Sequence, residues 1–87
     1  MPRVVVPSQL RSYTKGASEV DAAGETVADV LADLDRQFPG FRFRVIDEQE
    51  RVRPHILIFV GGERCEDVAA TVPETAEVFI AGALSGG

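Results

Sequence analysis

The sequence has one cysteine and one histidine among its 87 residues, and this shortage excludes several kinds of active site. Cys65 alone cannot close an internal disulfide. With only His55 to add, the chain lacks the ligand set of a zinc site or an iron–sulfur cluster. Glu63, Glu66 and Asp67 lie near Cys65 in sequence, and their negative charges disfavour a reactive thiolate. We therefore expect no metal site, an incidental role for Cys65 in a loop or at a sheet edge, and a strand-start position for His55.

Long apolar runs are also missing. The longest, ILIFV, has the length of a strand and is far short of the roughly 20 residues that span a membrane. The start, MPRVVVPSQL, has too short an apolar segment for a signal peptide. A net charge of −5 makes nucleic acid and anionic membranes poor partners. These features predict a soluble cytoplasmic protein that binds neither nucleic acid nor membrane.

Arginine is unevenly distributed, and lysine occurs once. Half of the arginines fall in one short stretch: Arg42, Arg44, Arg51 and Arg53. Two interpretations remain open, namely a solvated loop of mixed charge and a docking patch for an acidic partner.

The clearest predicted element is an amphipathic helix in ETVADVLADLDRQFPG. Its apolar residues recur at spacings of 3, 4, 7 and 11 from the first: Val27, Val30, Leu31, Leu34 and Phe38. Thr26 is a favourable N-cap, and Pro39-Gly40 should end the helix. The opposite face, which we expect to be exposed to solvent, carries Asp29, Asp33, Asp35 and Arg36.

Several short segments predict strands around this helix. They are residues 3–7, which end at a proline, residues 19–22, HILIFV at 55–60, ERCEDV at 63–68 and the alternating segment near 77–82. Residues 41–54 alternate briefly and then become charged, which predicts an irregular connection with one or two turns. One helix packed on a mixed sheet of four to five strands is the economical solution. With the first and last strands parallel through a right-handed crossover, this α+β arrangement is the β-grasp, or ubiquitin-like, fold.

Four stretches in this order resemble one family. VVVPSQLR, GETVADVLADLDRQFPG, RVRPHILIFVGG and EVFIAGALSGG are similar to the corresponding parts of the sulfur-carrier proteins MoaD, ThiS and CysO. The final Gly86-Gly87 is the most specific feature. The resemblance implies a β-grasp domain over residues 1–82 and a flexible tail over residues 83–87.

The resemblance implies a carrier and not an enzyme, as in the small subunit of molybdopterin synthase. A partner of the E1-like adenylating and sulfurtransferase class would use ATP to activate the carboxylate of Gly87, and a sulfur donor would convert it to a thiocarboxylate. A sulfur-acceptor synthase would then take the sulfur. The carrier itself would bind no cofactor and would be a monomer when free. The length of residues 41–54 favours cysteine-type carriers over the shorter thiamine type. Molybdopterin-type carriers and specialised relatives that supply sulfur to secondary metabolites remain open.

The role that the resemblance implies for the tail would explain why two glycines stand at its end. Threading into narrow partner channels favours residues without a Cβ atom, as at Gly86 and Gly87. Ala83, Leu84 and Ser85 would form an extended leash that pairs through its backbone, as an added strand does.

Strand alternation predicts a second functional surface. If Ile56, Ile58, Val60, Val78 and Ile80 pack under the helix, the opposite face carries Leu57, Phe59, Phe79 and Ala81. These four residues would dock a partner, or residues 41–54 would fold over them. Two other functions also remain open: a ubiquitin-like modifier joined through Gly87 to lysine, and an inert β-grasp interaction module.

Overall fold

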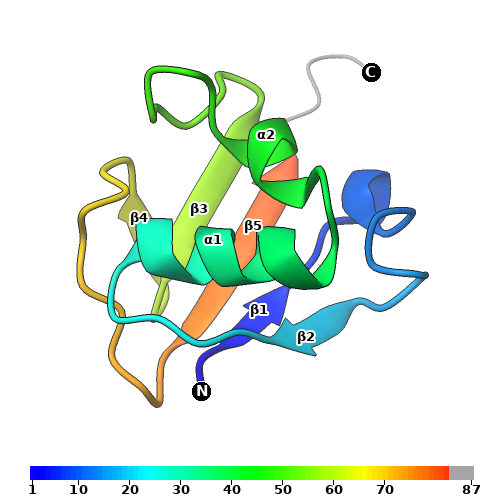
Figure 1. Cartoon of the computed structure of the whole chain (residues 1–87). Helices are drawn as coiled ribbons and strands as arrows, with labels where there is room; N and C mark the ends of the chain where they lie inside the picture. Colours follow the sequence, from blue (N-terminus) through cyan, green and yellow to red (C-terminus); the bar gives the residue numbers. More distant parts are fainter. Residues whose placement is uncertain (83–87) are drawn as a thin grey trace.

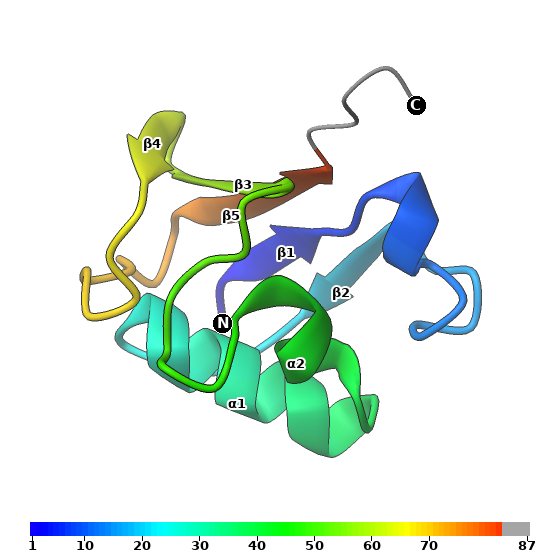
Figure 2. The same cartoon turned by 90° about the horizontal axis from the view of Figure 1, so that it is seen from above.

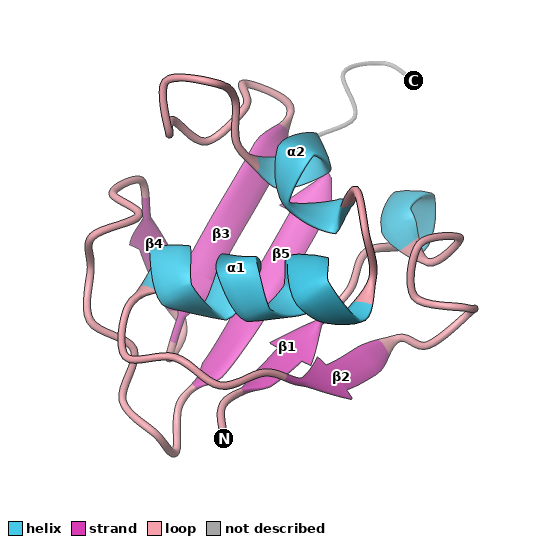
Figure 3. Cartoon of the chain, in the orientation of Figure 1, coloured by secondary structure: helices cyan, strands magenta, loops and turns pink. Residues whose placement is uncertain are grey.

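The computed structural model describes residues 1–82, which form one sheet covered on one face by two helices (Figures 1 and 3). The five strands are β1 (Arg3–Val5), β2 (Glu19–Asp21), β3 (Ile56–Val60), β4 (Glu63–Cys65) and β5 (Glu77–Gly82). The helices are α1 (Val27–Gln37) and α2 (Phe41–Val45), and a 3₁₀ turn, η1 (Ser8–Leu10), follows β1. The predicted α+β, β-grasp architecture is confirmed.

The sheet has the order β2-β1-β5-β3-β4. The first and last strands lie side by side and parallel, with Val4 opposite Val78. The other neighbouring strands are antiparallel. β5 is therefore the central strand, and both of its edges are paired over part of its length.

Helix α1 forms where the apolar period predicts it. The hydroxyl of Thr26 accepts a hydrogen bond from the backbone N–H of Asp29 at 3.1 Å, which satisfies one of the free donors at the helix start. After the helix, the chain turns at Gly40, whose φ of +95° lies in the region that favours glycine. Phe38 of the predicted stripe is partly buried. The other four apolar side chains of the stripe are fully buried: Val27, Val30, Leu31 and Leu34.

The expectation of an irregular connection over residues 41–54 is wrong at its start. Residues 41–45 form α2, which packs on the same side of the sheet as α1 (Figure 2). Phe41 and Val45 are fully buried, as is Ile46 directly after the helix. Phe41 and Val45 are four residues apart, a helical spacing, but FRFRV is too short for a period of 3.6 to be distinguished from the strand-like period of 2.

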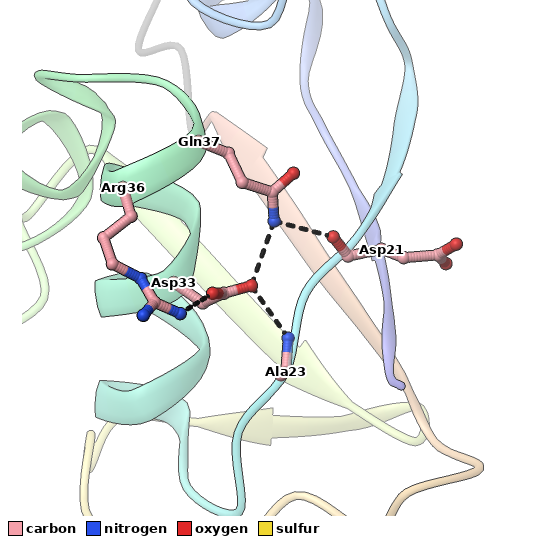
Figure 4. Close-up of polar contacts among 5 residues, drawn as sticks. All are labelled: Asp21, Ala23, Asp33, Arg36 and Gln37. Atoms are coloured by element: carbon pink, nitrogen blue, oxygen red, sulfur yellow. Dashed lines mark hydrogen bonds and ion pairs between the residues drawn. The ribbon is translucent and has the colours of Figure 1, made fainter.

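The expectation that Asp33 faces solvent is also wrong, because only 9% of this residue is exposed. Figure 4 shows the polar contacts of its carboxylate. Oδ2 of Asp33 accepts hydrogen bonds from the backbone N–H of Ala23 at 2.9 Å and from Nε2 of Gln37 at 3.0 Å, and Oδ1 pairs with the guanidinium of Arg36. Nε2 of Gln37 also donates to the backbone carbonyl of Asp21 at 3.0 Å. The carboxylate therefore ties α1 to the segment that follows β2.

These contacts favour the ionised form of Asp33. The hydrogen bond from the backbone of Ala23, followed by the one from Arg36, lowers the pKa of the Asp33 carboxyl.

Within residues 1–82, neither helix combines the length and apolar character needed to cross a bilayer.

Candidate functional site

The predicted reactive segment follows directly after β5. Its residues lie outside the described part of the chain: Ala83, Leu84, Ser85, Gly86 and Gly87. The structure does describe where this segment begins. Gly82, the last residue of β5, is paired with Ile56 at the start of β3, and Ala81 is paired with Leu57.

The four residues of the predicted second surface come together on one face of the sheet. Leu57 lies opposite Ala81, and Phe59 lies opposite Phe79, so each pair joins β3 to β5. The rings of Phe59 and Phe79 meet edge to face, with centroids 6.2 Å apart and planes at 69°. Phe79 is 43% exposed, whereas the other three are half-buried. We call these four residues the open-face patch.

Val5 extends the open-face patch across β1. It lies opposite Phe79 in the parallel ladder and is half-buried. Val5 could not be assigned to the patch from sequence, since the β-branched segment of β1 shows apolar character but not the register against β5. The adjoining ion pair of Arg3 and Glu19, at 3.5 Å, places charge beside the patch.

Segment 41–54 does not cover the open-face patch, so that alternative is wrong. Both α1 and α2 lie against the other face of the sheet (Figure 2). Phe41, Val45 and Ile46 belong to the core cluster there, together with Ile58 and Ile80. The described part of the chain thus leaves the patch open to solvent. Its role in docking remains a prediction.

The arginine cluster is organised around α2. Arg42 forms an ion pair with Glu50. The guanidinium of Arg44 contacts the hydroxyl of Tyr13 and lies 5.4 Å from the centre of its ring.

The remaining two arginines behave differently from each other. Arg53 lies 4.7 Å from the ring centre of Phe43 and donates from Nε to the Phe43 carbonyl at 2.7 Å. Arg51 donates from its backbone N–H to the Asp47 carboxylate at 3.0 Å. Three guanidinium groups thus have partners within the chain, as expected for a folded, charge-mixed surface.

Cys65 and His55 occupy peripheral positions. Cys65 ends the edge strand β4, and its thiol donates to the carbonyl of Asp67 at 3.2 Å. His55 is exposed and directly precedes β3. Both positions are the ones predicted from the sequence. Among residues 1–82, no three His, Cys, Asp or Glu side chains gather in a way that could hold a metal ion.

Comparisons with known proteins relate this chain to sulfur carriers. No family model matches it. The sulfur carrier protein CysO of Mycobacterium tuberculosis H37Rv is 29% identical in a match that covers 97% of this chain and 96% of that protein. A chain in the crystal structure of the Amycolatopsis orientalis BexX/CysO complex is 28% identical, with a TM-score of 0.92 over the whole of both chains.

A further structural neighbour is a protein named as a modifier and not as a sulfur carrier. The small archaeal modifier protein 1 of Methanosarcina acetivorans is 26% identical, with a TM-score of 0.75, over 100% of this chain and 98% of that one. These matches extend over nearly the full length of each protein. They agree both with the five-stranded β-grasp sheet and with the sequence features described above. The chain is therefore similar in sequence and in fold to CysO, which confirms its resemblance to the ubiquitin-like MoaD/ThiS/CysO proteins.

Proposed function

We propose that this protein is a sulfur carrier whose Gly87 carboxylate is adenylated by a partner enzyme and then converted to a thiocarboxylate. The observation that carries the proposal is the similarity to the sulfur carrier protein CysO over 97% of the chain. The pair Gly86-Gly87, which follows the central strand β5 after three intervening residues, supports it.

The chemistry explains the need for a partner. A free α-carboxylate has a pKa near 3.5 and is ionised at neutral pH, so it is a poor electrophile. Attack by a carboxylate oxygen of Gly87 on the α-phosphorus of ATP would displace pyrophosphate and form an acyl adenylate. Attack by a sulfide or persulfide sulfur on the acyl carbon would then displace AMP. After a persulfide attack, reductive cleavage by a thiol would release the thiocarboxylate.

The chain's own contribution would be presentation. β5 is the central strand, and its ladder with β3 continues to Gly82, so the point from which the tail departs is fixed by β3. The tail would then enter the partner's active site, where the absence of Cβ atoms at Gly86 and Gly87 permits close approach.

The proposal requires at least two partners, an E1-like adenylating enzyme and a synthase that accepts the sulfur. A structural neighbour occurs in a complex with a second protein, which supports protein binding. We propose the open-face patch as the docking surface for one of them. A Phe59→Glu variant should fold normally and bind that partner at least tenfold more weakly, as hot-spot losses of about 1.4 kcal/mol or more imply. Wild-type affinity in a folded Phe59→Glu protein would contradict this assignment.

The same comparisons suggest which biosynthetic pathway would use the sulfur. Similarity to CysO favours a cysteine-type carrier, and the neighbour bound to BexX makes a specialised biosynthetic role the next candidate. The molybdopterin-type role is the remaining alternative.

A ubiquitin-like modifier is the second candidate function, because the small archaeal modifier protein 1 shares 26% identity with this chain. Both functions begin with the same activation of Gly87. They differ in the product: a modifier forms an amide with a lysine of another protein, whereas a carrier accumulates a free thiocarboxylate. Covalent ladders in a cell extract would favour the modifier.

The decisive experiment is the accurate intact mass of a Cys65→Ser protein ending at Gly87. It is incubated with ATP, sulfide and an adenylating enzyme shown in parallel to activate a known sulfur carrier. Replacement of one oxygen by sulfur, localised to Gly87 and lost when Gly87 is deleted, is the expected result. Removing the thiol and measuring accurate mass separate this exchange from oxidation. An unchanged mass would refute the carrier proposal and favour an inert interaction module.

A further inference from the structure

The end of β5 is paired on one side only. The ladder between β1 and β5 stops at Val5 and Phe79. Beyond Val5 the chain reaches Pro7, which has no N–H to donate, and turns away into η1. On the other side, the ladder with β3 continues to Gly82, the last residue of β5.

The side chain of Gln9, from η1, lies against the backbone of Gly82. A methyl group added at Gly82 would be 2.7 Å from Cδ and 3.2 Å from Oε1 of Gln9, and closer still to Nε2. The φ angle of Gly82 is not positive, so the backbone itself would accept any residue there. By contrast, Gly61 and Gly62 have positive φ and open space around the missing Cβ. Gly82 is thus a site of close approach, and Gln9 is the group that approaches.

The backbone that carries Gln9 is well anchored. Leu10, the next residue, is buried and donates its N–H to the carbonyl of Pro7 at 2.9 Å. Nε of Arg11 donates to the carbonyl of Val6 at 3.1 Å. The amide of Gln9 lies in the direction of the Cβ that Gly82 lacks, and in a strand this direction points to a face of the sheet and not along its edge.

We propose that Gln9 is a positioning residue for the C-terminal tail. By covering Gly82 it restricts the directions in which the chain can leave β5. This role rests on the proposed carrier function, since it concerns delivery of Gly87 to the adenylating enzyme. A tail that points toward the channel for a larger fraction of the time binds with a higher apparent affinity. Chemistry after binding is unaffected.

The test measures initial rates of adenylation at increasing carrier concentration. An adenylating enzyme that activates a known carrier is used with wild type, Gln9→Ala, Gly82→Ala and the double variant. Gln9→Ala removes the side chain, and the added methyl group of Gly82→Ala displaces it. Each single change should therefore raise KM for the carrier about two- to tenfold, the usual range for losing the preorganisation of one side chain, while kcat stays constant. The double variant should be no worse than either single variant. Ser8→Ala, in the same turn, should behave as wild type.

Three kinetic results would overturn the role: KM unchanged in both single variants, effects that multiply in the double variant, or a fall in kcat with constant KM. As a folding control, each variant should have the same thermal unfolding temperature as the wild type.

A second measurement uses the carrier alone. Nuclear Overhauser contacts between the side-chain amide protons of Gln9 and the α protons of Gly82 are expected in wild type. Their absence would overturn the positioning role even if wild type carries sulfur. If they are present but Gly87 is never adenylated, the carrier function fails together with the role built on it, while the contact itself stands.

Discussion

Two phenylalanines of α2 allow a direct test of how this helix stabilises the fold. Phe41 and Phe43 lie two residues apart, but Phe41 is fully buried whereas Phe43 is 51% exposed. We expect Phe41→Ala to destabilise the protein far more than Phe43→Ala.

The magnitudes follow from burial. Truncating a fully buried phenylalanine costs about 3–5 kcal/mol, because apolar contacts are lost and a cavity remains. Phe43 keeps about half of its surface in water, so its burial contributes about 1 kcal/mol. The Arg53 guanidinium 4.7 Å from its ring centre adds about 0.5–1 kcal/mol. Phe43→Ala should therefore cost about 1–2 kcal/mol.

Thermal unfolding followed by circular dichroism measures the difference. In a domain of this size, 1 kcal/mol corresponds to roughly 4–8 °C in Tm, so Phe41→Ala should lower Tm by about 12–40 °C. The Phe43→Ala shift should be smaller, about 4–16 °C. Urea titrations with equal m-values would show that both variants unfold from a comparably compact state. Similar losses for the two variants would refute the placement of Phe41 in the core.

Three further predictions concern α1 and the tail. Thr26→Ala should cost about 1 kcal/mol of stability in urea titrations, because the start of α1 loses its cap; an unchanged midpoint would contradict the observed capping bond. The lowered pKa of Asp33 stabilises the fold at pH values above the ordinary aspartate value of about 3.9, and this contribution is lost as the pH falls through the lower folded value. Asp33→Asn should thus be less stable than wild type at pH 7 and approach it in strongly acidic urea titrations; a constant difference at all pH values would exclude this linkage. Finally, Gly87→Ala should slow adenylate formation much more than Ala83→Ser, and equal rates would argue against a threaded tail.

The elements that could be predicted from sequence are those whose pattern repeats. The stripe from Val27 to Phe38 extends over three helical turns, so its period is unambiguous. The alternation in β3 and β5 likewise separates Ile58 and Ile80, which are buried, from Phe59 and Phe79 on the open face. α2 was missed because it has only five residues.

Contacts that depend on chain closure could not be predicted. Asp33 belongs to a polar helix face by sequence, but the segment after β2 brings the N–H of Ala23 to its carboxylate. Nothing in the order of residues places Gln9 against Gly82, since more than 70 positions separate them. The position of the β1–β5 register, which adds Val5 to the open-face patch, also becomes visible only in the folded sheet.

The central position of β5 has a mechanical consequence. Hydrogen bonds of a ladder lie across the strand direction, so a pull along β5 from the Gly82 end loads them in shear. β5 pairs with three residues of β1 and five residues of β3, and these bonds share the load instead of opening one after another. A terminal strand at the sheet edge would have only one ladder to resist the same pull. If an enzyme pulls on the chain beyond Gly82, the hydrogen bonds of β5 should therefore resist the pull and keep the strand in the sheet.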